Sequence, residues 1–532
     1  MSGPRDVRMW RALLWAALAA GCADEFENSD PKFEVVPAAD YPVPDEMTRT
    51  QVDTVAVAVA LDGRAVTSAS VRWQSSDNSV LRVSSILDSL HAEITAQGVG
   101  NAEITATVTP GRDIPDTVLQ DTVRVLERWI EVGVGRSLSC GLNVDSTAYC
   151  WDAKLQPTRV PGMLEFAAAN LEVGHTTACV VVLRDTPYCW GQNSLGEIGN
   201  GDEARHPVAV EGAIGRASDA LVGLSAGGTF FCGNFHRPSG RGSRFFIQCW
   251  GNAALRQLGV PPPADTVPTC GFSQKQYPCR KVLLFDGDSL RIHINASSVN
   301  AGESHACAIR EDSFPGAVYC WGAAATGQLG PPNDSLGPCP SEGMWLCGGP
   351  AVVNPEPRFL SVSAGWDIFV TNTSPESALT SWFAEGHTCA VATDSTVYCW
   401  GKNDHGQLGA ASDATCNRVA TATPPTVPCR FTPQAVEAPP PGTFRAVSLG
   451  SEHTCGIMTN DSIYCWGSDS LGQLGDSATQ SRVTPAPIRS DQRFGSVSAG
   501  PYRTCGLTLD EGRIFCWGDS LGSKPTQVLD PN

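Results

Sequence analysis

Hydrophobic and polar residues alternate along the segment that follows the first 32 residues of the chain. The alternation is clearest in Ser70–Asp77, Ala92–Ala96 and Ala102–Thr107. Successive side chains of a β-strand point to opposite faces, so this alternation is typical of strands that bury one face. We therefore predict a small β-sandwich over residues 33–127.

A second pattern occupies residues 128–532, where short apolar runs are separated by Gly, Asp, Asn and Pro. It recurs in seven copies, each with four β-type runs. One copy contains Val447–Gly450, His453–Ile457, Ile463–Gly467, Gly472–Gly475 and Pro485–Ile488. Such self-similarity indicates stacked supersecondary units. Four short strands per unit are the content of a propeller blade, so we predict an all-β chain with a seven-bladed β-propeller after the sandwich.

The recurring motifs resemble those of the regulator of chromosome condensation repeat family. They are Cys-Trp-Gly at Cys465–Gly467, His-Thr-Cys at His453–Cys455 and Gly-Gln-Leu-Gly at Gly472–Gly475. The resemblance implies a seven-bladed propeller. The first copy departs from the family pattern, with Trp151-Asp152 and no Gly-Gln-Leu-Gly, and the last copy has only a shortened Leu521-Gly522.

The sandwich segment resembles a bacterial immunoglobulin-like group 2 domain over residues 33–126. This resemblance implies a spacer or adhesion module of an envelope protein, and Trp73 fits the core position of such a domain. The predicted fold class is therefore all-β, a seven-bladed β-propeller preceded by a small immunoglobulin-like β-sandwich.

The chain contains 21 cysteines, and fourteen of them flank the central hairpin of the seven copies. Midpoints of the regular couples fall on turn-forming residues such as Asp145-Ser146, Asp185, Asp394-Ser395 and Asn460-Asp461, which places the two cysteines opposite each other on adjacent strands. Directly opposed residues lie roughly 4.5–5.5 Å apart at Cα, within reach of a disulfide. The couples are Cys140 with Cys150, Cys179 with Cys189, Cys232 with Cys249, Cys307 with Cys320, Cys389 with Cys399, Cys455 with Cys465 and Cys505 with Cys516.

Zinc binding is the alternative interpretation of these couples. A histidine precedes the first cysteine in four copies, at His175, His305, His387 and His453. Two cysteines and one histidine leave zinc short of its usual tetrahedral ligand set, and an exported chain meets oxidising conditions. We therefore predict disulfides and no metal. Six further cysteines pair by proximity, as Cys270 with Cys279, Cys339 with Cys347 and Cys416 with Cys429.

The N-terminal residues have the features of a secretion signal. Three arginines precede the apolar run Ala12–Ala20, which is too short to span a bilayer. The stretch Leu18–Cys22 resembles a bacterial lipobox, which implies a lipoprotein signal peptide over residues 1–21, lipidation of Cys22 and a tether over residues 22–32. An ordinary signal peptide with a chance cysteine is the alternative.

The predicted location follows from this signal. We expect a cell-envelope protein on the extracytoplasmic side, at the outer membrane or cell surface, whose lipid is its sole membrane contact. The formal net charge of −18 would repel a phosphate backbone, so we predict no nucleic-acid partner.

Candidate catalytic residues are scarce in the sequence. It contains no phosphate-binding loop and no nucleophile elbow, so we predict a protein without enzymatic activity, catalytic residues or cofactor. We interpret the histidines as local turn supports, because they are spread around a ring instead of converging on one point. A hydrolase or lyase that uses a carboxylate pair at the central channel is an alternative.

One tryptophan recurs in each copy at the same strand position. We interpret these residues as packing between neighbouring blades, with carbohydrate stacking as the alternative. The seven are Trp151, Trp190, Trp250, Trp321, Trp400, Trp466 and Trp517.

Insertions interrupt the repeat in the third, fourth and fifth copies. Three follow the Gly-Gln-Leu-Gly position, at Val260–Lys281, Pro331–Gly349 and Ala410–Phe431, and each contains one extra cysteine pair. In up-and-down blades these insertions leave between the third and fourth strands and share one face. Another insertion, Trp366–Glu385, lies between the first and second strands of the fifth copy and falls on the same face. A lengthened hairpin at Phe235–Arg244 emerges on the opposite face.

This rim of loops is the predicted binding surface, because cross-linked loops lose little entropy on binding and aromatic residues are good anchors. The predicted partner-binding residues are Trp366, Phe369, Trp382 and Phe383. We therefore predict a non-enzymatic cell-envelope lipoprotein whose propeller is a scaffold for an envelope or extracellular protein or a glycan. The alternative functions are guanine-nucleotide exchange and enzyme inhibition, as in other members of the repeat family. Drift in a tolerant scaffold is the alternative origin of the insertions.

Overall fold

The computed structural model describes residues 33–531 apart from short internal stretches. Those stretches are 62–63, 67–68, 86–89, 110–114, 163–167, 183–185, 213–219, 240–241, 260–268, 273–274, 281–291, 293, 312–314, 333–336, 339–345, 354–355, 367, 372–380, 418–425 and 438–442. The chain divides into two compact units, one of Met1–Met47 with Gln51–Val125 and one of Thr48–Thr50 with Leu126–Asn532. Within the described residues, no helix has the length and hydropathy that a membrane span requires.

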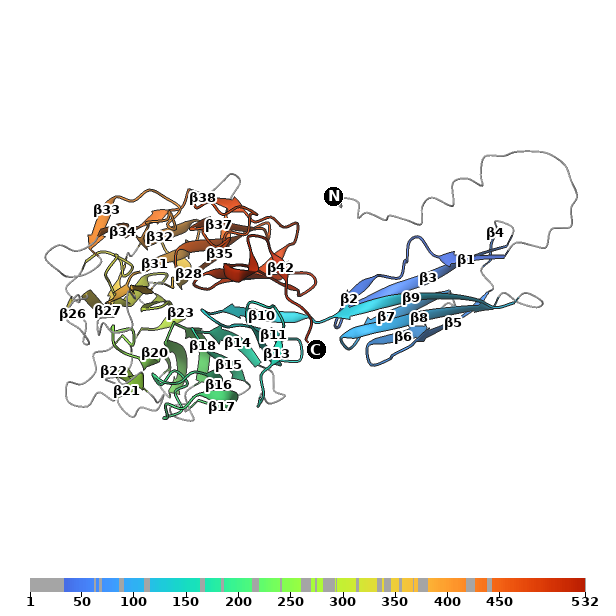
Figure 1. Ribbon diagram of the computed structural model, residues 1–532, viewed down its shortest axis with the longest axis horizontal. Coiled ribbons are helices and arrows are strands. Elements are labelled where there is room, and N and C mark those ends of the chain that lie inside the picture. Colours follow the sequence, from blue (N-terminus) through green and yellow to red (C-terminus); the bar gives the residue numbers. More distant parts are fainter. Residues whose placement is uncertain are drawn as a thin grey trace, which may run out of the picture. The chain divides into compact units, whose positions relative to one another are not determined.

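The first unit is a sandwich of two antiparallel sheets (Figure 1), with strand orders β1-β3-β7-β6, where β4 also pairs with β3, and β2-β9-β8-β5. The strands are β1 (Phe33–Pro37), β2 (Glu46–Thr48), β3 (Val52–Leu61), β4 (Arg64–Ala65), β5 (Ser70–Ser75), β6 (Leu81–Ser85), β7 (His91–Ala96), β8 (Gly100–Thr109) and β9 (Thr117–Leu126). Burial alternates along β7 and β8, which directs Ile94 and Ile104 into the core. Trp73 is partly buried and packs against two core clusters, at the core position that the resemblance implies.

The second unit is a seven-bladed β-propeller (Figure 1). Each blade is an antiparallel sheet in up-and-down order whose first strand lines the central channel. Blades 1 to 3 are built from β10 (Trp129–Val134), β11 (Ser139–Asn143), β12 (Ala148–Trp151), β13 (Thr158–Arg159); β14 (Ala168–Val173), β15 (Thr177–Val182), β16 (Thr186–Gly191), β17 (His206–Glu211); and β18 (Ala220–Ala226), β19 (Phe230–Ser239), β20 (Gly242–Asn252), β21 (Thr269–Phe272), β22 (Lys275–Arg280).

The remaining blades follow the same plan. Blades 4 and 5 are built from β23 (Ala296–Ala301), β24 (His305–Arg310), β25 (Val318–Ala323), β26 (Gly337–Pro338), β27 (Leu346–Val352); and β28 (Phe359–Ala364), β29 (Ile368–Thr371), β30 (Ser381–Ala384), β31 (His387–Ala392), β32 (Val397–Lys402), β33 (Ala414–Asn417), β34 (Thr426–Ala435). Blades 6 and 7 are built from β35 (Phe444–Leu449), β36 (His453–Met458), β37 (Ile463–Gly467), β38 (Arg482–Pro487); and β39 (Phe494–Ala499), β40 (Arg503–Thr508), β41 (Ile514–Gly518), β42 (Thr526–Gln527). The all-β fold class predicted from the sequence is confirmed.

The central hairpin of each blade brings two cysteines into register. In blade 6, Cys455 of β36 lies opposite Cys465 of β37, and the turn between them has Asp461 at a φ of 67°. Disulfides join all seven hairpin couples that the sequence predicts, with Cα atoms 4.0 to 4.1 Å apart. These cross-links tie the second and third strands of every blade together. In chain order they join Cys140 to Cys150, Cys179 to Cys189, Cys232 to Cys249, Cys307 to Cys320, Cys389 to Cys399, Cys455 to Cys465 and Cys505 to Cys516.

The cysteines of the insertions are described in part. Cys416 and Cys429 form an eighth disulfide, and Cys347 is also disulfide-bonded. The predicted lipidation site Cys22, the signal peptide, the tether, Cys339 and the side chains of Cys270 and Cys279 lie outside the described residues.

Blades 3, 4 and 5 carry an extra hairpin beyond the third strand, as the insertions predict. The added pairs are β21 with β22, β26 with β27, and β33 with β34, and the longer strand of each pair also joins the blade. Up-and-down order puts all three hairpins on the face of the connections between first and second strands. Their labels lie along one side of the ring, away from β10 and β42 (Figure 1). Blade 5 has a further hairpin, β29–β30, between β28 and β31.

The ring closes without exchange of strands, because each blade is complete within its own copy. Trp129 and Leu155 of blade 1 share a core cluster with Ile514 and Val528 of blade 7. The C-terminal segment also reaches blade 1, where Asp530 accepts a hydrogen bond of 2.9 Å from the backbone N–H of Glu127. Side-chain packing and these local bonds therefore close the propeller.

Tryptophan side chains join each regular blade to the one before it. Trp466 of blade 6 is fully buried, and its Nε1 donates to the backbone carbonyl of Gln407 in blade 5 at 2.9 Å. The packing role predicted for the tryptophans is confirmed. The equivalent bonds of 2.9 to 3.0 Å run from Trp250 to Glu197, Trp321 to Gln257, Trp400 to Gln328 and Trp517 to Gln473.

The Gly-Gln-Leu-Gly loop presents this carbonyl. In blade 5, the Gln407 side chain accepts a hydrogen bond from the backbone N–H of His405, which braces the loop. Leu408 is fully buried in the same cluster as Trp466. Gly409 has a φ of 67°, and a Cβ there would lie 3.0 Å from Trp466 Nε1, so only glycine fits both the backbone and the contact.

The histidines that precede the hairpin cysteines also join blades, and the interpretation of them as local turn supports is wrong. His387 Nε2 lies 2.9 Å from Thr454 Oγ1 of the next blade, and that hydroxyl donates to the Gln407 carbonyl at 3.0 Å. Since the threonine hydrogen is used on the carbonyl, His387 donates through a protonated Nε2. His305 with Thr388 and His453 with Thr504 repeat the arrangement.

Burial explains the charge state of these three histidines. They are fully buried, which lowers the pKa of His305, His387 and His453 to about 3 and keeps the rings neutral near pH 7. A neutral ring that is bonded to its neighbour is a structural link, so these residues do not form an acid–base site.

Candidate functional site

The central channel is a cavity of about 300 Å³ bordered by the first strands of all seven blades. Serine side chains on this wall bond the backbone of the next blade. Ser225 accepts a hydrogen bond from the N–H of Ala301, and Ser498 accepts one from the N–H of Val134, both at 3.0 Å. These polar groups of the channel wall therefore hold neighbouring blades together.

Glu172 replaces the serine in blade 2. Its Oε2 accepts a hydrogen bond of 3.1 Å from the N–H of Ala226 in blade 3, so the carboxyl takes over the blade-joining role. The side chain borders the channel and is partly exposed, yet the narrow wall withholds enough water to raise its pKa to about 8. The protonated form of Glu172 is therefore favoured near pH 7, and its hydrogen bond to blade 3 gives it a structural role.

Three side chains from different blades meet at the mouth of the channel. His175 Nε2 of blade 2 lies 2.5 Å from Oε2 of Glu303 in blade 4, and Glu303 is 2% exposed. The His175 ring stacks on Trp366 of blade 5, with centroids 5.9 Å apart, and Trp366 itself lines the channel. This cluster, the mouth cluster, links three blades across the channel opening.

A charged network joins blades 5 and 6. Nζ of Lys402 is 2.9 Å from Glu385, 3.4 Å from Asp404 and 3.5 Å from Glu452. Lys402 is 1% exposed and Glu385 is fully buried. A buried ammonium requires such partners, because its desolvation costs several kcal/mol.

Asp404 of this network is held in the ionised form. Burial opposes ionisation of Asp404, but hydrogen bonds from His405 and Gln407 and the charge of Lys402 outweigh it, so the pKa of Asp404 lies well below its usual range. The hydrogen bond to Asp404 in turn raises the pKa of His405. Asp404 therefore carries its charge near pH 7.

Asp404, His405 and Glu452 are the described residues whose donor atoms could hold a metal ion, since these atoms lie within 4.8 Å of one another. The ammonium of Lys402 already contacts both carboxylates. A metal would have to displace or oppose this buried positive charge, so electrostatics disfavours the site. The residues present do not fit a resident metal.

Of the four predicted partner-binding residues, the structure describes the side chain of Trp366 alone. Trp366 is 7% exposed, so its ring forms part of the mouth cluster instead of projecting from a loop. Phe369, Trp382 and Phe383 lie on β29 and β30, with Phe369 opposite Phe383, and their side chains are not among those described. Their role in binding a partner stays a prediction.

Three charged residues at the channel and the blade junctions were not predicted from the sequence. Glu172, Glu303 and Lys402 each occupy a position that holds a different residue in the regular copies, and this departure from the repeat is the signal that could have found them. Which residues they contact depends on neighbouring blades, so their partners are not visible in a single copy.

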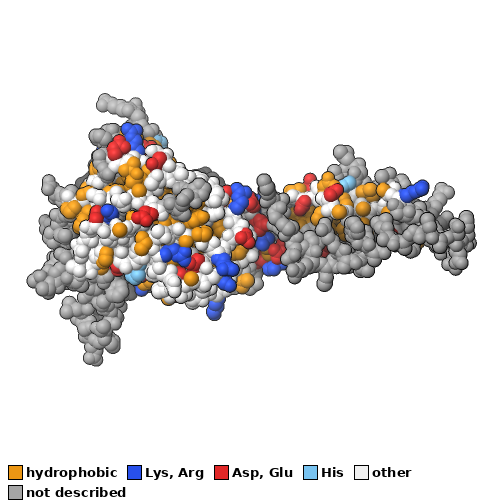
Figure 2. All heavy atoms as spheres, turned by 90° about the horizontal axis from the view of Figure 1, so that it is seen from above, with side chains coloured by type: hydrophobic (Ala, Val, Ile, Leu, Met, Phe, Trp, Pro, Cys, Tyr) orange, Lys and Arg blue, Asp and Glu red, His pale blue; other side chains and the backbone are white. Residues whose placement is uncertain are grey.

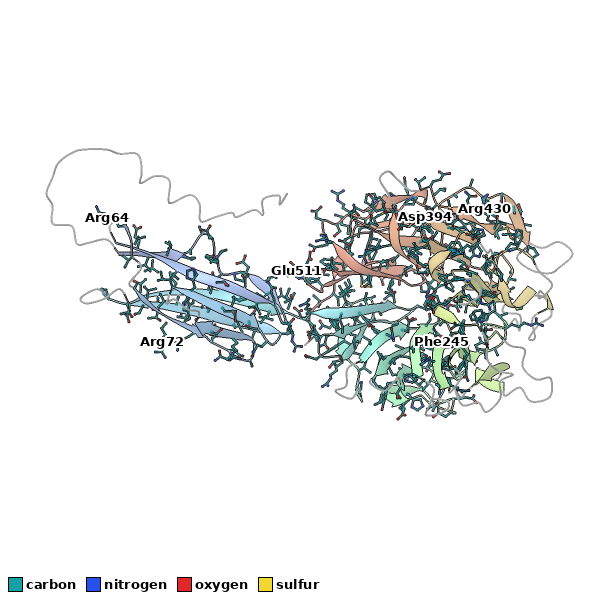
Figure 3. All side chains as sticks on the ribbon, turned by 180° about the vertical axis from the view of Figure 1, so that it is seen from behind. Arg64, Arg72, Phe245, Asp394, Arg430 and Glu511 are labelled. Carbon is teal, nitrogen blue, oxygen red and sulfur yellow. A yellow bond between two sulfur atoms is a disulfide. The ribbon has the colours of Figure 1, made fainter. Side chains whose placement is uncertain are left out.

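Opposite charges lie close together on the described surface. Figure 2 shows Lys and Arg beside Asp and Glu in small groups, among hydrophobic and uncharged side chains. Arg430 of β34 pairs with Asp413 at 3.0 Å, and the labels Arg430 and Glu511 mark opposite sides of the ring (Figure 3). The extended hairpin of blade 5 is thus braced by an ion pair as well as by a disulfide.

Two comparisons with known proteins concern the repeat. The family model for the regulator of chromosome condensation (RCC1) repeat matches residues 394–457 and 460–507, and a second model of the same description matches 444–473 and 496–521. The ultraviolet-B receptor UVR8 of Arabidopsis thaliana is 24% identical over 62% of this chain. The probable E3 ubiquitin-protein ligase HERC6 of Homo sapiens is 28% identical over 43%. The chain spans 60% of the length of the first relative and 19% of the second.

Among solved structures, Prp20p from Saccharomyces cerevisiae is 17% identical and covers 70% of this chain and 80% of its own, with a TM-score of 0.49. The family matches fall on blades 5 to 7, where the tryptophan and histidine links are complete. Residues 394–521 of the seven-bladed β-propeller therefore match repeats of the regulator of chromosome condensation family.

Proposed function

We propose that this propeller is a non-enzymatic binding scaffold of the cell envelope, whose face with the extra hairpins recognises an envelope or extracellular protein or a glycan. The observation that carries the proposal is the addition of one hairpin to each of three adjacent blades, all on the same face. Structure that a blade does not need for folding, gathered on one face, is typical of a recognition surface.

The blade 5 hairpin has the rigidity that a binding loop benefits from. Cys416 and Cys429 are 4% and 0% exposed within a small core of their own that includes Val427. Arg430 and Asp413 add the ion pair described above. A cross-linked hairpin loses little conformational entropy when a partner binds, which favours affinity.

The titratable groups on the channel wall and at the blade junctions favour binding over catalysis. The blade-joining histidines are neutral, Glu172 is protonated near pH 7, and Lys402 is neutralised by carboxylates. Each of these groups is engaged in holding blades together. A catalytic site would need a base or nucleophile that is free to react with substrate.

The test compares two loop variants of the full chain. In the first, residues 367–384 are replaced by a short Gly-Ser linker, which keeps Trp366 and Glu385 and joins chain ends that the pairing of Ile368 with Ala384 already brings together. In the control, residues 237–244 are replaced by Asn-Gly, which links the paired positions His236 and Phe245 on the opposite face. We expect immobilised full chain and control to capture the same envelope protein or glycan, and the first variant to lose it. Equal capture by both variants would show that the β29–β30 hairpin is not part of the binding surface.

The envelope location rests on the lipobox-like sequence before Cys22 and on the disulfides, which form in oxidising compartments. Lipidation at Cys22 is tested by feeding cells a labelled fatty acid. The full chain should carry the label and sediment with membranes, whereas Cys22→Ala should do neither. An unlabelled wild-type chain, or label that survives the substitution, would remove the anchor from the proposal.

A further inference from the structure

The junction between blades 1 and 2 lacks the link that joins the regular blades. In blade 2, Nε1 of Trp190 is buried and has no hydrogen-bond partner among the described residues. Five other tryptophans donate from this atom to the loop of the preceding blade. The preceding blade here is blade 1, whose connection between third and fourth strands is residues 152–157, whereas that of blade 6 is residues 468–481. The absent Gly-Gln-Leu-Gly loop leaves the Trp190 donor unmatched.

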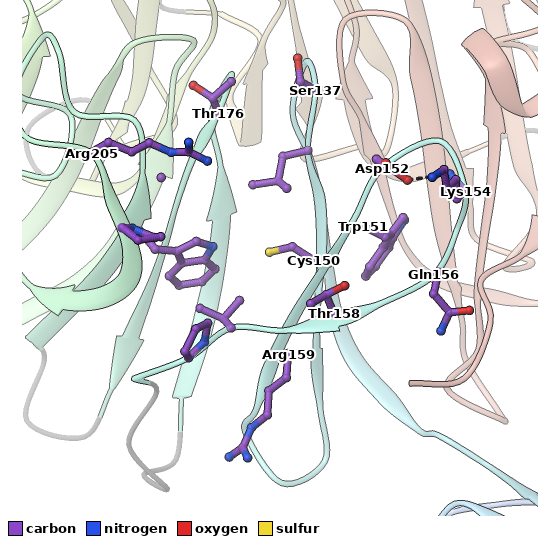
Figure 4. A pocket seen from close by; sticks show the side chains of 16 residues that line it. Ser137, Cys150, Trp151, Asp152, Lys154, Gln156, Thr158, Arg159, Thr176 and Arg205 are labelled. Atoms are coloured by element: carbon purple, nitrogen blue, oxygen red, sulfur yellow. Dashed lines mark hydrogen bonds between the residues drawn. The ribbon is translucent and has the colours of Figure 1, made fainter. Parts of the chain in front are cut away.

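A pocket of about 670 Å³ occupies the position of the missing loop (Figure 4). Leu138, Val160 and Trp190 contribute apolar walls. At the regular junctions this space is filled by a leucine or isoleucine that is 0 to 3% exposed: Ile198, Leu258, Leu329, Leu408 and Leu474. The pocket could therefore accommodate a branched apolar side chain next to Trp190.

The junction between blades 7 and 1 shows that loss of the loop does not by itself open a pocket. Trp151 also has a buried Nε1 without a hydrogen-bond partner among the described residues. There, however, Leu155 and Val528 pack into the same cluster as Trp151 and fill the space. The chain supplies its own replacement at one junction and leaves the other open.

The open junction exposes a disulfide that is covered elsewhere. Cys150 borders the pocket and is partly exposed, whereas the other thirteen hairpin cysteines are 0% exposed. In Figure 4, Cys150 lies between Arg159 and Arg205. The pocket thus reaches the sheet surface that a neighbouring loop covers in the other blades.

The rim of the pocket is basic. Lys154, Arg159 and Arg205 are exposed and border it, and none of the three has an ion pair with a described residue. Asp152 is the acidic residue of the lining, and its Oδ1 accepts a hydrogen bond from the backbone N–H of Lys154. In a chain of net charge −18, three unpaired cations around one opening favour an acidic ligand.

We propose that this pocket binds an acidic, leucine-containing peptide segment of a partner protein in place of the missing loop. The leucine fills the apolar space, a backbone carbonyl of the segment accepts the hydrogen bond of Trp190 Nε1, and flanking carboxylates contact Arg159 and Arg205. The site goes beyond the proposed function, because it lies between blades 1 and 2, away from the extra hairpins of blades 3 to 5.

The probe is a synthetic peptide with the sequence of the blade 6 loop, Asp469–Asp476, capped at both ends. It contains Gly-Gln-Leu-Gly between two aspartates and has a net charge that complements the rim. Binding of the labelled peptide to the full chain is measured by fluorescence anisotropy at two salt concentrations. We expect saturable binding that weakens with salt, and no binding of a peptide in which Leu474 is replaced by Asn.

Two variants assign the binding to the pocket. Trp190→Phe keeps an aromatic ring but removes the unmatched donor, and should weaken binding about fivefold, the value of one neutral hydrogen bond. Arg159→Gln with Arg205→Gln should weaken it at least as much and reduce its salt dependence, because two exposed charges are lost. Trp466→Phe is the matched control and should leave peptide binding unchanged, since that indole already bonds Gln407.

Reduction of Cys140–Cys150 gives an independent readout. Bound peptide should slow the reduction of this disulfide by a water-soluble phosphine, because it covers Cys150. Failure to bind at millimolar peptide, or equal binding by wild type, Trp190→Phe and the double arginine variant, would overturn the inference. Neither result depends on the loop face of blades 3 to 5, so the proposed function would stand or fall separately.

Discussion

Two junctions of the propeller join blades of the same fold through different hydrogen bonds. They are the junction between blades 5 and 6 and the junction between blades 1 and 2. At the first, Trp466 and Thr454 of blade 6 both donate to one carbonyl of blade 5, and His387 donates to that threonine. At the second, Ala178 stands in place of the threonine and Trp190 has no acceptor among the described residues. The recurring residues of the repeat therefore serve largely as an interface between neighbouring blades.

The irregular junctions are maintained by other means. Blade 1 is held to blade 7 by Asp530, which accepts from Glu127, and by the backbone bond from Leu529 to Leu155 at 3.0 Å. Blades 1 and 2 share a cluster of apolar residues that includes Leu142, Leu171 and Trp190. Glu131 of blade 1 also accepts hydrogen bonds from the backbone N–H groups of Asn170 and Leu171 in blade 2. Apolar burial and other hydrogen bonds therefore hold this junction without the tryptophan link.

Acid should have the largest effect, because it should destabilise the junctions of blades 4 to 7 more than the others. Among the described residues, the histidine links occur only at those junctions. The unfolded pKa of histidine is 6.5 and the folded value is about 3 at His305, His387 and His453. Below pH 6.5 these histidines bind protons in the unfolded chain but not in the folded chain. The stability that their neutral form contributes is therefore fully present above pH 6.5 and is lost as the pH falls towards 3. Each histidine costs about 1.4 kcal/mol per pH unit in this window.

The three together cost about 7 kcal/mol between pH 6.5 and 4.5. Glu172 and Glu197, with folded pKa values of about 8 and about 6, act in the opposite direction, so the histidine contribution is measured as a difference. In the variant His387→Gln, unfolding should take up about one proton fewer. Its urea midpoint should therefore depend less steeply on pH than that of the wild type. Hydrogen exchange at pH 4.5 should rise in blades 4 to 7 before blades 1 to 3. A uniform rise, or an unchanged slope in the variant, would contradict the assignment.

Removal of a tryptophan should lower the free energy of unfolding by different amounts at the two kinds of junction. This effect should be smaller than that of acid. Trp466→Ala leaves a closed cavity next to Leu408 and should lower the free energy of unfolding by about 3–5 kcal/mol. Trp190→Ala should cost less, because the space opens into an existing pocket and no hydrogen bond is broken. The measurement is denaturant unfolding of the oxidised full chain. Equal losses would mean that the pocket is not open in solution.

Selective reduction should sharpen the comparison without a large change in stability. A phosphine reductant at neutral pH should reach Cys140–Cys150 first, because Cys150 is partly exposed while Cys455 and Cys465 are fully buried. Alkylation followed by mass spectrometry identifies the first pair to open. Simultaneous reduction of all hairpin disulfides would indicate global unfolding instead of local access.

The candidate site was only partly predictable. The period of the repeat and the spacing of the insertions place the extra hairpins between third and fourth strands, and β22, β27 and β34 bear this out. The mouth cluster could not be predicted, because His175 and Glu303 lie two blades apart and meet only when the ring closes. The pocket beside Trp190 could not be predicted either, since an absent loop at one junction is filled and at the other is not.

The sequence by itself determined the all-β class, the seven blades and the seven hairpin disulfides, because alternation, turn residues and cysteine spacing act within a single copy. Only the tertiary structure decided what the histidines and charged residues do. Their partners belong to neighbouring blades, so His387 reads as a turn residue in its own copy and is a neutral hydrogen-bond link between two copies. Contacts between copies depend on how the ring packs, and that packing is a property of the whole propeller.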